Sequence, residues 1–369
     1  MKVSAQAVRL HDARSYKLRF WAAALGSFTI TAASCNAVTP TEDTTGPIWP
    51  TKEWQISSPE KEGMDSRALA KLVDWGTAHS LDSVLVARHG RIVLEGYYAP
   101  YTAGSLHQVY SVTKSVVSTL VAIAWKDGLL DSLNHRVLDF FDRRSLANVD
   151  ERKESITVQN LLDMTSGFEW TEQVGSIIPP IETDREMAVS VDWVKFILDL
   201  PMSCAPGGSF NYDSGNPHLL SAILTKLAGS NTLEYAKAKL FGPLGIKEVK
   251  WSLDPQGVPN GGWGLWLLPR DMLKIGYLYL RKGVWEGKQL LPTDWANNVS
   301  HGTVDTHLNH WFRYSDLFWV LPDKAVYAAI GRYGQAIMVF PDLDVVAVTT
   351  SRTAYPSYEL ADCISDSVK

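Results

Sequence analysis

The stretch from Tyr110 to Trp125 constrains the fold more than any other part of the chain. It opens with Tyr-Ser-Val-Thr-Lys-Ser, and the run 116–125 that follows is almost entirely apolar. Because this run leaves no polar face for solvent, it predicts a helix buried inside the molecule. Asp127-Gly128 then supplies a helix stop. We therefore expect a buried helix from Ser111 onward, with other elements packed around it.

Ser111 and Lys114 share one face of this expected helix, because residues three apart lie one turn from each other. An amine there can accept the hydroxyl proton, while a helix N-terminus favours negative charge that develops nearby. A second Ser-x-x-Lys, Ser58 to Lys61, precedes no apolar helix, so we interpret it as loop. The alternative for Ser111 is a simple helix cap.

The other elements are expected in an order that places helices between strands. Helices are predicted at 66–79, 157–164, 191–200, 217–228, 232–240 and 269–280, and strands at 83–88, 91–98, 316–321, 325–330, 335–341 and 344–351. This order implies an α+β fold: an antiparallel sheet flanked by helices, with a large helical subdomain inserted at about 106–263. The active site is expected in the cleft between the two.

The N-terminus has the pattern of an export signal. Basic residues precede the short apolar segment 20–35, so residues 1–35 are predicted to be a signal peptide. Ala32-Ala33-Ser34-Cys35 resembles the bacterial lipoprotein box, in which Cys35 would be lipidated and tether the chain to a membrane. The alternative is an ordinary signal with an unmodified cysteine. Residues 36–53 are expected to form an exposed tether, and 54–369 the folded domain of an exported, periplasmic or cell-envelope protein.

Charge and residue spacing exclude several functions. The net charge of −5 provides no basic surface for nucleic acid. His307 and His310 lack the helical pattern of a zinc site, so we interpret them as loop residues and expect neither metal nor organic cofactor. Cys204 and Cys363 are equally compatible with a disulfide and with free thiols. The sequence carries no signal for an oligomeric state.

Two later motifs complement Ser111 and Lys114. The first is Tyr212-Asp213-Ser214, with Asn216 close behind, and it offers a phenol that can relay a proton. The second is Gly331-Arg332-Tyr333-Gly334-Gln335, and it offers a cationic strand start that can lie against a substrate carbonyl. Trp170 follows a Thr-Ser-Gly turn and is a candidate for the cleft wall. Each has a structural alternative: a buried aromatic for Tyr212, a turn for Ser214 and Asn216, a solvated charge for Arg332, and core packing for Trp170.

Together these motifs resemble the serine β-lactamase and penicillin-binding-protein superfamily. The chain is most similar to the class C β-lactamase-like branch, which includes family VIII esterases, D-alanyl-D-alanine carboxypeptidases and 6-aminohexanoate-dimer hydrolases. The resemblance runs from about Trp54 to Thr350, and its supporting segments are 84–98, 161–167, 241–245 and 269–272. It implies a β-lactamase-like fold and a reaction without a cofactor.

The resemblance also implies roles for individual residues. Ser111 would be the nucleophile, Lys114 its base and Tyr212 the proton relay, with Ser214 at the third place of a Tyr-x-Ser motif. Arg332, Tyr333 and Gly334 fall where β-lactamases have Lys-Thr-Gly, and the backbone N–H near Gln335 would join that of Ser111 in an oxyanion hole. Because a Tyr ring replaces the threonine hydroxyl, the departure favours ester or amide cleavage over β-lactam binding.

The leading hypothesis is a serine hydrolase that cleaves a small carboxylic ester, a linear amide or a peptide-like molecule through an acyl-serine intermediate. The second is a β-lactamase or a D-alanyl-D-alanine carboxypeptidase. A hypothesis of another class is a non-catalytic envelope protein that binds peptidoglycan fragments or a protein partner. The joint presence of Ser111, Lys114 and Tyr212 argues against the last, because a binding protein needs no such combination.

Overall fold

The computed structural model describes residues 46–172, 182–308, 312–353 and 357–369. A nine-stranded sheet runs in the order β1-β3-β2-β14-β13-β12-β11-β10-β9, and two small sheets, β4-β6-β5 and β7-β8, lie beside it. Neighbouring strands of the large sheet are antiparallel, except that β1 pairs parallel with β3. The strands are β1 (Gln55–Ile56), β2 (Leu81–Arg88), β3 (Arg91–Tyr97), β4 (His107–Gln108), β5 (Lys250–Trp251), β6 (Leu265–Leu267), β7 (Val284–Trp285), β8 (Lys288–Gln289), β9 (Val304–Asp305), β10 (Arg313–Ser315), β11 (Phe318–Leu321), β12 (Val326–Gly331), β13 (Gln335–Phe340) and β14 (Val345–Ser351).

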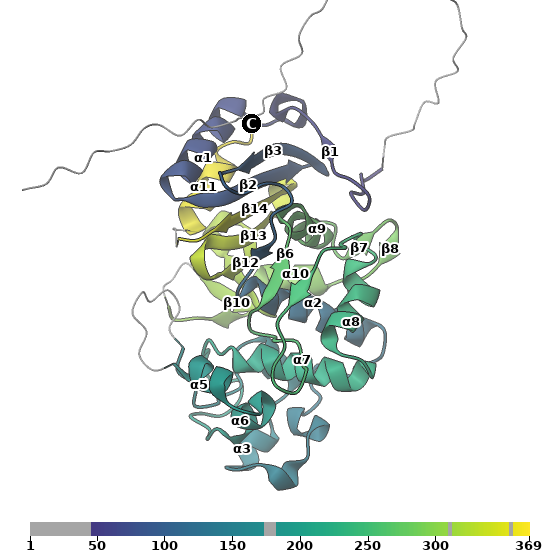
Figure 1. Cartoon of the computed structure of the whole chain (residues 1–369), viewed down its shortest axis with the longest axis vertical. Helices are drawn as coiled ribbons and strands as arrows, with labels where there is room; N and C mark the ends of the chain where they lie inside the picture. The colour runs from purple at the N-terminus through teal and green to yellow at the C-terminus, as the bar shows by residue number, and fades with distance from the viewer. Residues whose placement is uncertain (1–45, 173–181, 309–311, 354–356) are drawn as a thin grey trace, which may run out of the picture.

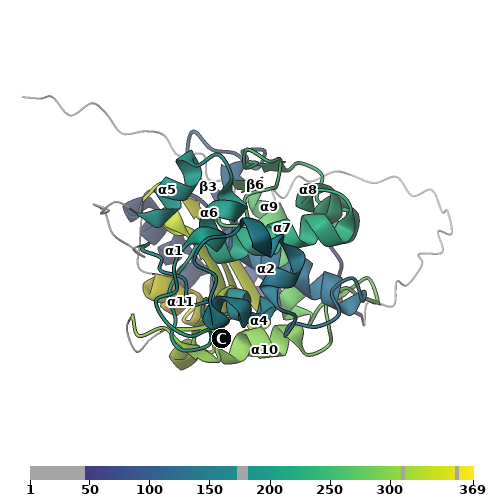
Figure 2. The same cartoon turned by 90° about the horizontal axis from the view of Figure 1, so that it is seen from below.

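Helices cover the large sheet and extend below it in Figure 1, where α3, α5, α6 and α7 form the lower part of the molecule. The helices are α1 (Ser66–Ala78), α2 (Val112–Lys126), α3 (Glu151–Glu154), α4 (Val158–Leu162), α5 (Thr183–Val189), α6 (Trp193–Asp199), α7 (Gly215–Ala228), α8 (Thr232–Ala236), α9 (Pro269–Leu280), α10 (Trp295–His301) and α11 (Ser357–Ser365). Helix α2 contacts α7 on one side and strands β12 and β13 on the other, and it lies near the centre of the view in Figure 2. The expected α+β class is therefore present.

Alternating residues of the central strands explain why both faces of the sheet are covered. In β14, Val346 and Val348 belong to the core that includes α2 and α9, whereas Val345 and Ala347 belong to the core that includes α1 and α11. Successive side chains of a strand point to opposite faces, so an apolar strand must be covered on both. The sheet is thus sandwiched between two helical layers.

Local sequence signals place several elements where they were predicted. The Asp65 side chain accepts a hydrogen bond from the Arg67 N–H and starts α1. His89 and Gly90 have φ values of 51° and 77° and form the tight turn between β2 and β3. Every residue of α2 from Val112 to Ala124 is buried. These helices and this hairpin confirm the corresponding predictions.

Other boundaries differ from the prediction for identifiable reasons. Asp316 and Leu317 both have positive φ and turn the chain between β10 and β11, so the strand predicted from residue 316 starts at Phe318. The second half of the helix predicted at 232–240 widens into a π-helical turn, Lys237–Phe241. The supposed loop around Lys61 contains one 3-10 turn, Pro59–Glu62, which begins with the proline. Helices α3, α5, α10 and α11, strands β1, β9 and β10 and the two small sheets were not predicted.

The N-terminal predictions fall mostly on residues that the structure does not describe. The signal peptide, Cys35 and the start of the tether belong to residues 1–45, and His310 belongs to 309–311. Among the described residues, Trp49 already packs against Tyr277 and Trp285, so the folded part begins before Trp54. Cys204 and Cys363 are free thiols. No helix within the described ranges is both long and apolar enough to cross a membrane.

A half-buried carboxyl group, that of Asp163, and a buried one, that of Asp316, join α4 to the turn between β10 and β11. Gln159 Nε2 donates to Asp163 at 2.9 Å and to Asp316 at 3.0 Å, and the Asp316 N–H donates to Asp163 at 3.3 Å. Burial, and the neighbouring Asp316, raise the pKa of Asp163 to about 6. Burial also raises the pKa of Asp316. The helical part is therefore linked to the sheet by two acids that resist ionisation together.

This pair predicts a defined pH dependence of stability. In the unfolded chain Asp163 loses its proton near pH 4, but in the folded chain only near pH 6, so the pair's contribution falls as the pH rises through that interval. Urea unfolding measures this as the difference in the free energy of unfolding between Asp163→Asn and the unmodified protein. Between pH 4 and pH 6.5 this difference should shift in favour of the variant by on the order of 2 kcal/mol. The same substitution at the exposed Asp323, Asp323→Asn, should leave the difference in the free energy of unfolding constant over this pH range. A constant difference between Asp163→Asn and the unmodified protein would contradict the assignment.

Candidate active site

A pocket of about 280 Å³ opens where the N-termini of α2 and α7 approach the turn between β12 and β13. It is lined by Gln108, Tyr110, Ser111, Glu172, Asp184, Arg185, Ala188, Ser214, Trp263 and Arg332. Three residues expected at the site, Ser111, Ser214 and Arg332, therefore share one concave surface. The others lie behind this surface or beside it.

Ser111 sits at the first position before α2, with its side chain at the pocket surface. The preceding Tyr110 has a φ of +46°, a left-handed conformation that is uncommon for an aromatic residue and marks a sharp turn into the helix. Gly331, at the end of β12, packs against this turn: a Cβ there would lie 2.4 Å from the Val109 carbonyl oxygen and 3.1 Å from the Ser111 nitrogen. Glycine at 331 thus lets the strand approach the Ser111 amide.

Lys114 lies one turn further along α2 and is only 1% exposed. Its Nζ is 3.1 Å from Ser111 Oγ, 2.8 Å from Ser214 Oγ and 2.8 Å from the Gly262 carbonyl oxygen. Three acceptors match the three N–H bonds of an ammonium group. The predicted contact between the serine hydroxyl and the lysine amine is present, and an amine in this place can take the hydroxyl proton.

Glu172 holds Ser214 in place. Its Oε1 accepts from Ser214 Oγ at 2.7 Å, and its Oε2 accepts from the Ser214 N–H at 2.8 Å and from Trp170 Nε1 at 2.9 Å. Trp170 is buried and does not line the pocket, so its contribution is this hydrogen bond rather than a wall. Sequence reasoning did not single out Glu172; its only signal was its place two residues after Trp170.

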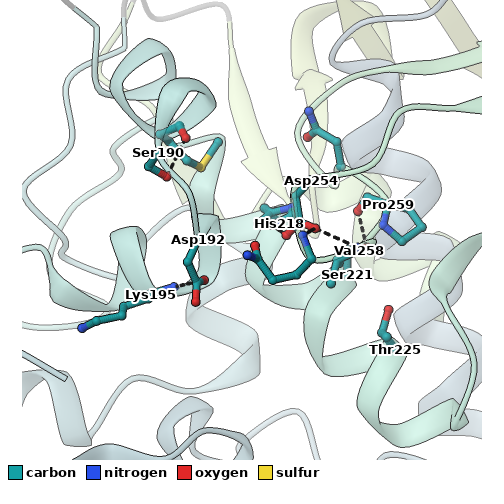
Figure 3. A network of polar contacts seen from close by, with 12 residues as sticks. Ser190, Asp192, Lys195, His218, Ser221, Thr225, Asp254, Val258 and Pro259 are labelled. Carbon is teal, nitrogen blue, oxygen red and sulfur yellow. Dashed lines mark hydrogen bonds and ion pairs between the residues drawn. The ribbon is translucent and has the colours of Figure 1, made fainter. Parts of the chain in front are cut away.

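The loop that carries the Gly262 carbonyl and Trp263 is anchored to α7 by buried polar contacts (Figure 3). His218 Nε2 lies 3.1 Å from Asp254 Oδ2, and Ser221 Oγ donates to the Pro259 carbonyl at 2.6 Å. Asp254 Oδ1 accepts from the Val258 N–H at 2.8 Å. These contacts fix the carbonyl group that accepts from Lys114, although Gly262 lies 148 residues away in the sequence.

Tyr212 is buried, and its ring packs against Lys114 and Trp319. Lys114 Nζ lies over its ring, 4.8 Å from the centroid, and the ring stacks on Trp319 at 5.6 Å. No hydrogen bond links its hydroxyl to Ser111 or Lys114 in this structure. The ring face therefore stabilises a cation at Lys114, and the relay expected of the hydroxyl is not supported by a contact.

The third motif forms the turn between β12 and β13, in the gap between the two predicted strands. Arg332, Tyr333 and Gly334 make the 3-10 turn between β12 and β13, because Tyr333 and Gly334 both have positive φ. Arg332 reaches the pocket, while Tyr333 is exposed and packs edge-on against Tyr110 at 5.3 Å. The Gln335 side chain donates to the Ser351 carbonyl and so points away from the pocket.

Asn216 and Asp213 serve the start of α7. Asp213 Oδ1 accepts from the N–H groups of Gly215 at 2.6 Å and Asn216 at 3.2 Å, and Asn216 does not line the pocket. Burial, and the nearby Glu172, raise the pKa of Asp213 to about 8. Asp184, at the pocket surface, also has a raised pKa because it is partly buried near Glu172 and Glu182. The acidic side of the pocket is therefore crowded with carboxyl groups.

Metal ligands are not grouped in the described parts of the chain, where no three His, Cys, Asp or Glu side chains could together hold a metal ion. The polar groups that meet at the pocket are instead a hydroxyl, an amine, carboxylates and guanidinium groups.

Known proteins similar to this chain share its architecture. A family model described as Beta-lactamase matches residues 69–363. The 6-aminohexanoate-dimer hydrolase of Paenarthrobacter ureafaciens is 22% identical in an alignment of 288 residues, which covers 73% of this chain and 72% of that protein. EstCE1, a hydrolase with promiscuous acyltransferase activity, superimposes with a TM-score of 0.68 at 16% identity, over 81% of this chain and 98% of the other. A D-stereospecific amidohydrolase from Streptomyces sp. gives a TM-score of 0.63 at 15% identity, over 82% and 98%.

Proposed function

The chain belongs to the beta-lactamase family, and from that premise we propose that this serine hydrolase cleaves a carboxylic ester or a linear amide through an acyl-serine intermediate. The membership also confirms the superfamily and the β-lactamase-like fold that the motifs led us to expect. The observation that carries the proposal is the 3.1 Å contact between Lys114 Nζ and Ser111 Oγ at the surface of a pocket.

The proposed reaction begins from the neutral form of Lys114, whose Nζ takes the proton of Ser111 Oγ. The oxygen attacks the carbonyl carbon, and the N–H groups of Ser111 and Gln335 are proposed to stabilise the resulting oxyanion. Collapse of the tetrahedral intermediate breaks the ester or amide bond, and the protonated Lys114 returns the proton to the leaving group. Water then attacks the acyl-serine by the reverse sequence, which regenerates Ser111.

The pocket's charges support a linear, polar substrate. Glu172 and Asp184 lie on its acidic side, while Arg185 and Arg332 supply guanidinium groups. An amide with a free amine at one end and a carboxylate at the other would find a partner for each charge. The similarity to a 6-aminohexanoate-dimer hydrolase supports the same substrate class.

The runner-up function is hydrolysis of a β-lactam or a D-alanyl peptide, which the family name supports. The turn at Arg332 and Tyr333 weighs against it, because an exposed tyrosine ring packed against Tyr110 stands where the β-lactamase motif supplies a threonine hydroxyl. A non-catalytic binding role is disfavoured by the buried amine held beside Ser111. Export and lipid attachment at Cys35 remain proposals that rest on the sequence pattern of residues 1–35.

Covalent labelling tests the proposed nucleophile. A fluorophosphonate should modify the purified protein at a single site, because only a serine with an adjacent base attacks phosphorus readily. Peptide mass spectrometry should locate the adduct on Ser111, and p-nitrophenyl acetate should be hydrolysed faster than nitrocefin. Modification at another serine would refute the proposal. So would the absence of any modification together with no turnover of either substrate. Faster nitrocefin cleavage would favour the runner-up.

A further inference from the structure

The hydrogen bonds around Lys114 determine where its lone pair must point once it has lost a proton. A neutral amine has two N–H bonds and one lone pair, whereas its three partners are Ser111 Oγ, Ser214 Oγ and the Gly262 carbonyl oxygen. The carbonyl can only accept, so one N–H must face Gly262. The outcome therefore depends on whether the lone pair turns to Ser111 or to Ser214.

Glu172 decides between these two serines. The Ser214 hydroxyl proton is donated to Glu172 Oε1 at 2.7 Å, so Ser214 Oγ can only accept from Lys114. The second N–H of the amine then faces Ser214, and the lone pair is left facing the Ser111 hydroxyl. We propose that Glu172 is a positioning residue that, through Ser214, directs the lone pair of Lys114 toward Ser111; this inference rests on the proposed function.

The orientation of Glu172 is itself fixed by two further donors. Its Oε2 accepts both the Ser214 N–H at 2.8 Å and Trp170 Nε1 at 2.9 Å. In Glu172→Gln the amide oxygen must take this place, because an NH2 group there would face two N–H donors. The amide NH2 group must then face Ser214 Oγ and donate to it. The substitution therefore reverses one hydrogen bond while it preserves the size of the side chain.

The reversed bond should misdirect the lysine. In Glu172→Gln the Ser214 hydroxyl proton has Lys114 Nζ as its remaining acceptor, so it occupies the lone pair that should face Ser111. We expect single-turnover acylation by p-nitrophenyl acetate to slow by about tenfold or more, because general base catalysis is then largely lost. Removing the competing hydroxyl should restore part of the rate, so Glu172→Gln with Ser214→Ala should acylate at least about threefold faster than Glu172→Gln alone.

The increase in acylation rate on adding Ser214→Ala to Glu172→Gln distinguishes a positioning role of Glu172 from a purely structural one. If Glu172 only stabilised the loop, the second change would slow acylation further or leave it unaltered. Asp184→Asn removes a carboxylate charge from the same pocket without touching Ser214, so adding Ser214→Ala to it should give no gain. Thermal unfolding of each variant identifies any loss of folded protein.

The possible results distinguish the two proposals. Ser111-dependent turnover by the unmodified protein, a slow Glu172→Gln and the partial recovery would establish the role of Glu172. Ser111-dependent turnover with an unaffected Glu172→Gln, or with no recovery in the double variant, would overturn this inference alone. Absence of Ser111-dependent turnover in the unmodified protein would overturn both.

Discussion

Replacing Ser111 with alanine should reduce hydrolysis of p-nitrophenyl acetate by about 10³-fold or more, with thermal unfolding little changed. Among the residues that the structure describes, its Oγ is the one hydroxyl oxygen that combines contact with Lys114 Nζ and a place at the pocket surface without donating its proton to a carboxylate. Ser214 Oγ also contacts Lys114, but its proton is committed to Glu172, so it is a poor substitute nucleophile. Steady-state kinetics with ester substrate provides the measurement.

Ser58 is the matched control for this substitution. It begins the other Ser-x-x-Lys sequence, which the structure places at a single 3-10 turn that does not line the pocket. Ser58→Ala should therefore leave the rate unchanged. Turnover by Ser111→Ala within tenfold of that of the unmodified protein would show that another group performs the chemistry. This would hold even if the fluorophosphonate labelled Ser111 in the unmodified protein.

The features that could be predicted from sequence are those that depend on neighbours along the chain. Helix α2 is predicted by its length and apolar character, and the Ser111–Lys114 contact follows from helical spacing alone. The hairpin at His89-Gly90 follows from local backbone preference. A strand's two apolar faces, as in β14, require covering helices, although sequence did not reveal α11 as one of them.

The features that escaped prediction depend on contacts between distant segments. Glu172 contacts Ser214 and Gly262 contacts Lys114 because a loop and an anchored turn bring them to the site, and neither belongs to a periodic pattern. Motif matching identified Tyr212 as a member of the site but could not reveal that its ring, rather than its hydroxyl, faces the amine. The left-handed backbone of Tyr333, in the turn between β12 and β13, likewise has no signal in the motif.

Two lysines in this chain are equally buried and yet are held by different partners. Lys114 is 1% exposed and Lys153 is 0% exposed, and each places its Nζ against three oxygen atoms. The partners of Lys153 are the carbonyl groups of Ala147, Leu198 and Leu200, at 3.0, 2.7 and 2.7 Å. Carbonyl oxygens have no proton to give, so Lys153 can only hold the chain together. Two of the three partners of Lys114 are hydroxyl groups, which makes proton transfer to it chemically available.

This contrast makes Lys114→Met and Lys153→Met an informative pair. Lys114→Met should lower kcat/KM for ester hydrolysis by about 10² to 10⁴-fold, because Ser111 loses its base. Its stability should change by less than about 2 kcal/mol, because only one of its three partners is a carbonyl group that loses its donor, whereas the other two are hydroxyl groups that can themselves donate. Lys153→Met should lose about 3 kcal/mol or more, because three buried carbonyls lose their donor, yet its kcat/KM per folded molecule should be unchanged. Equal rates in the two variants would show that Lys114, like Lys153, serves only the fold.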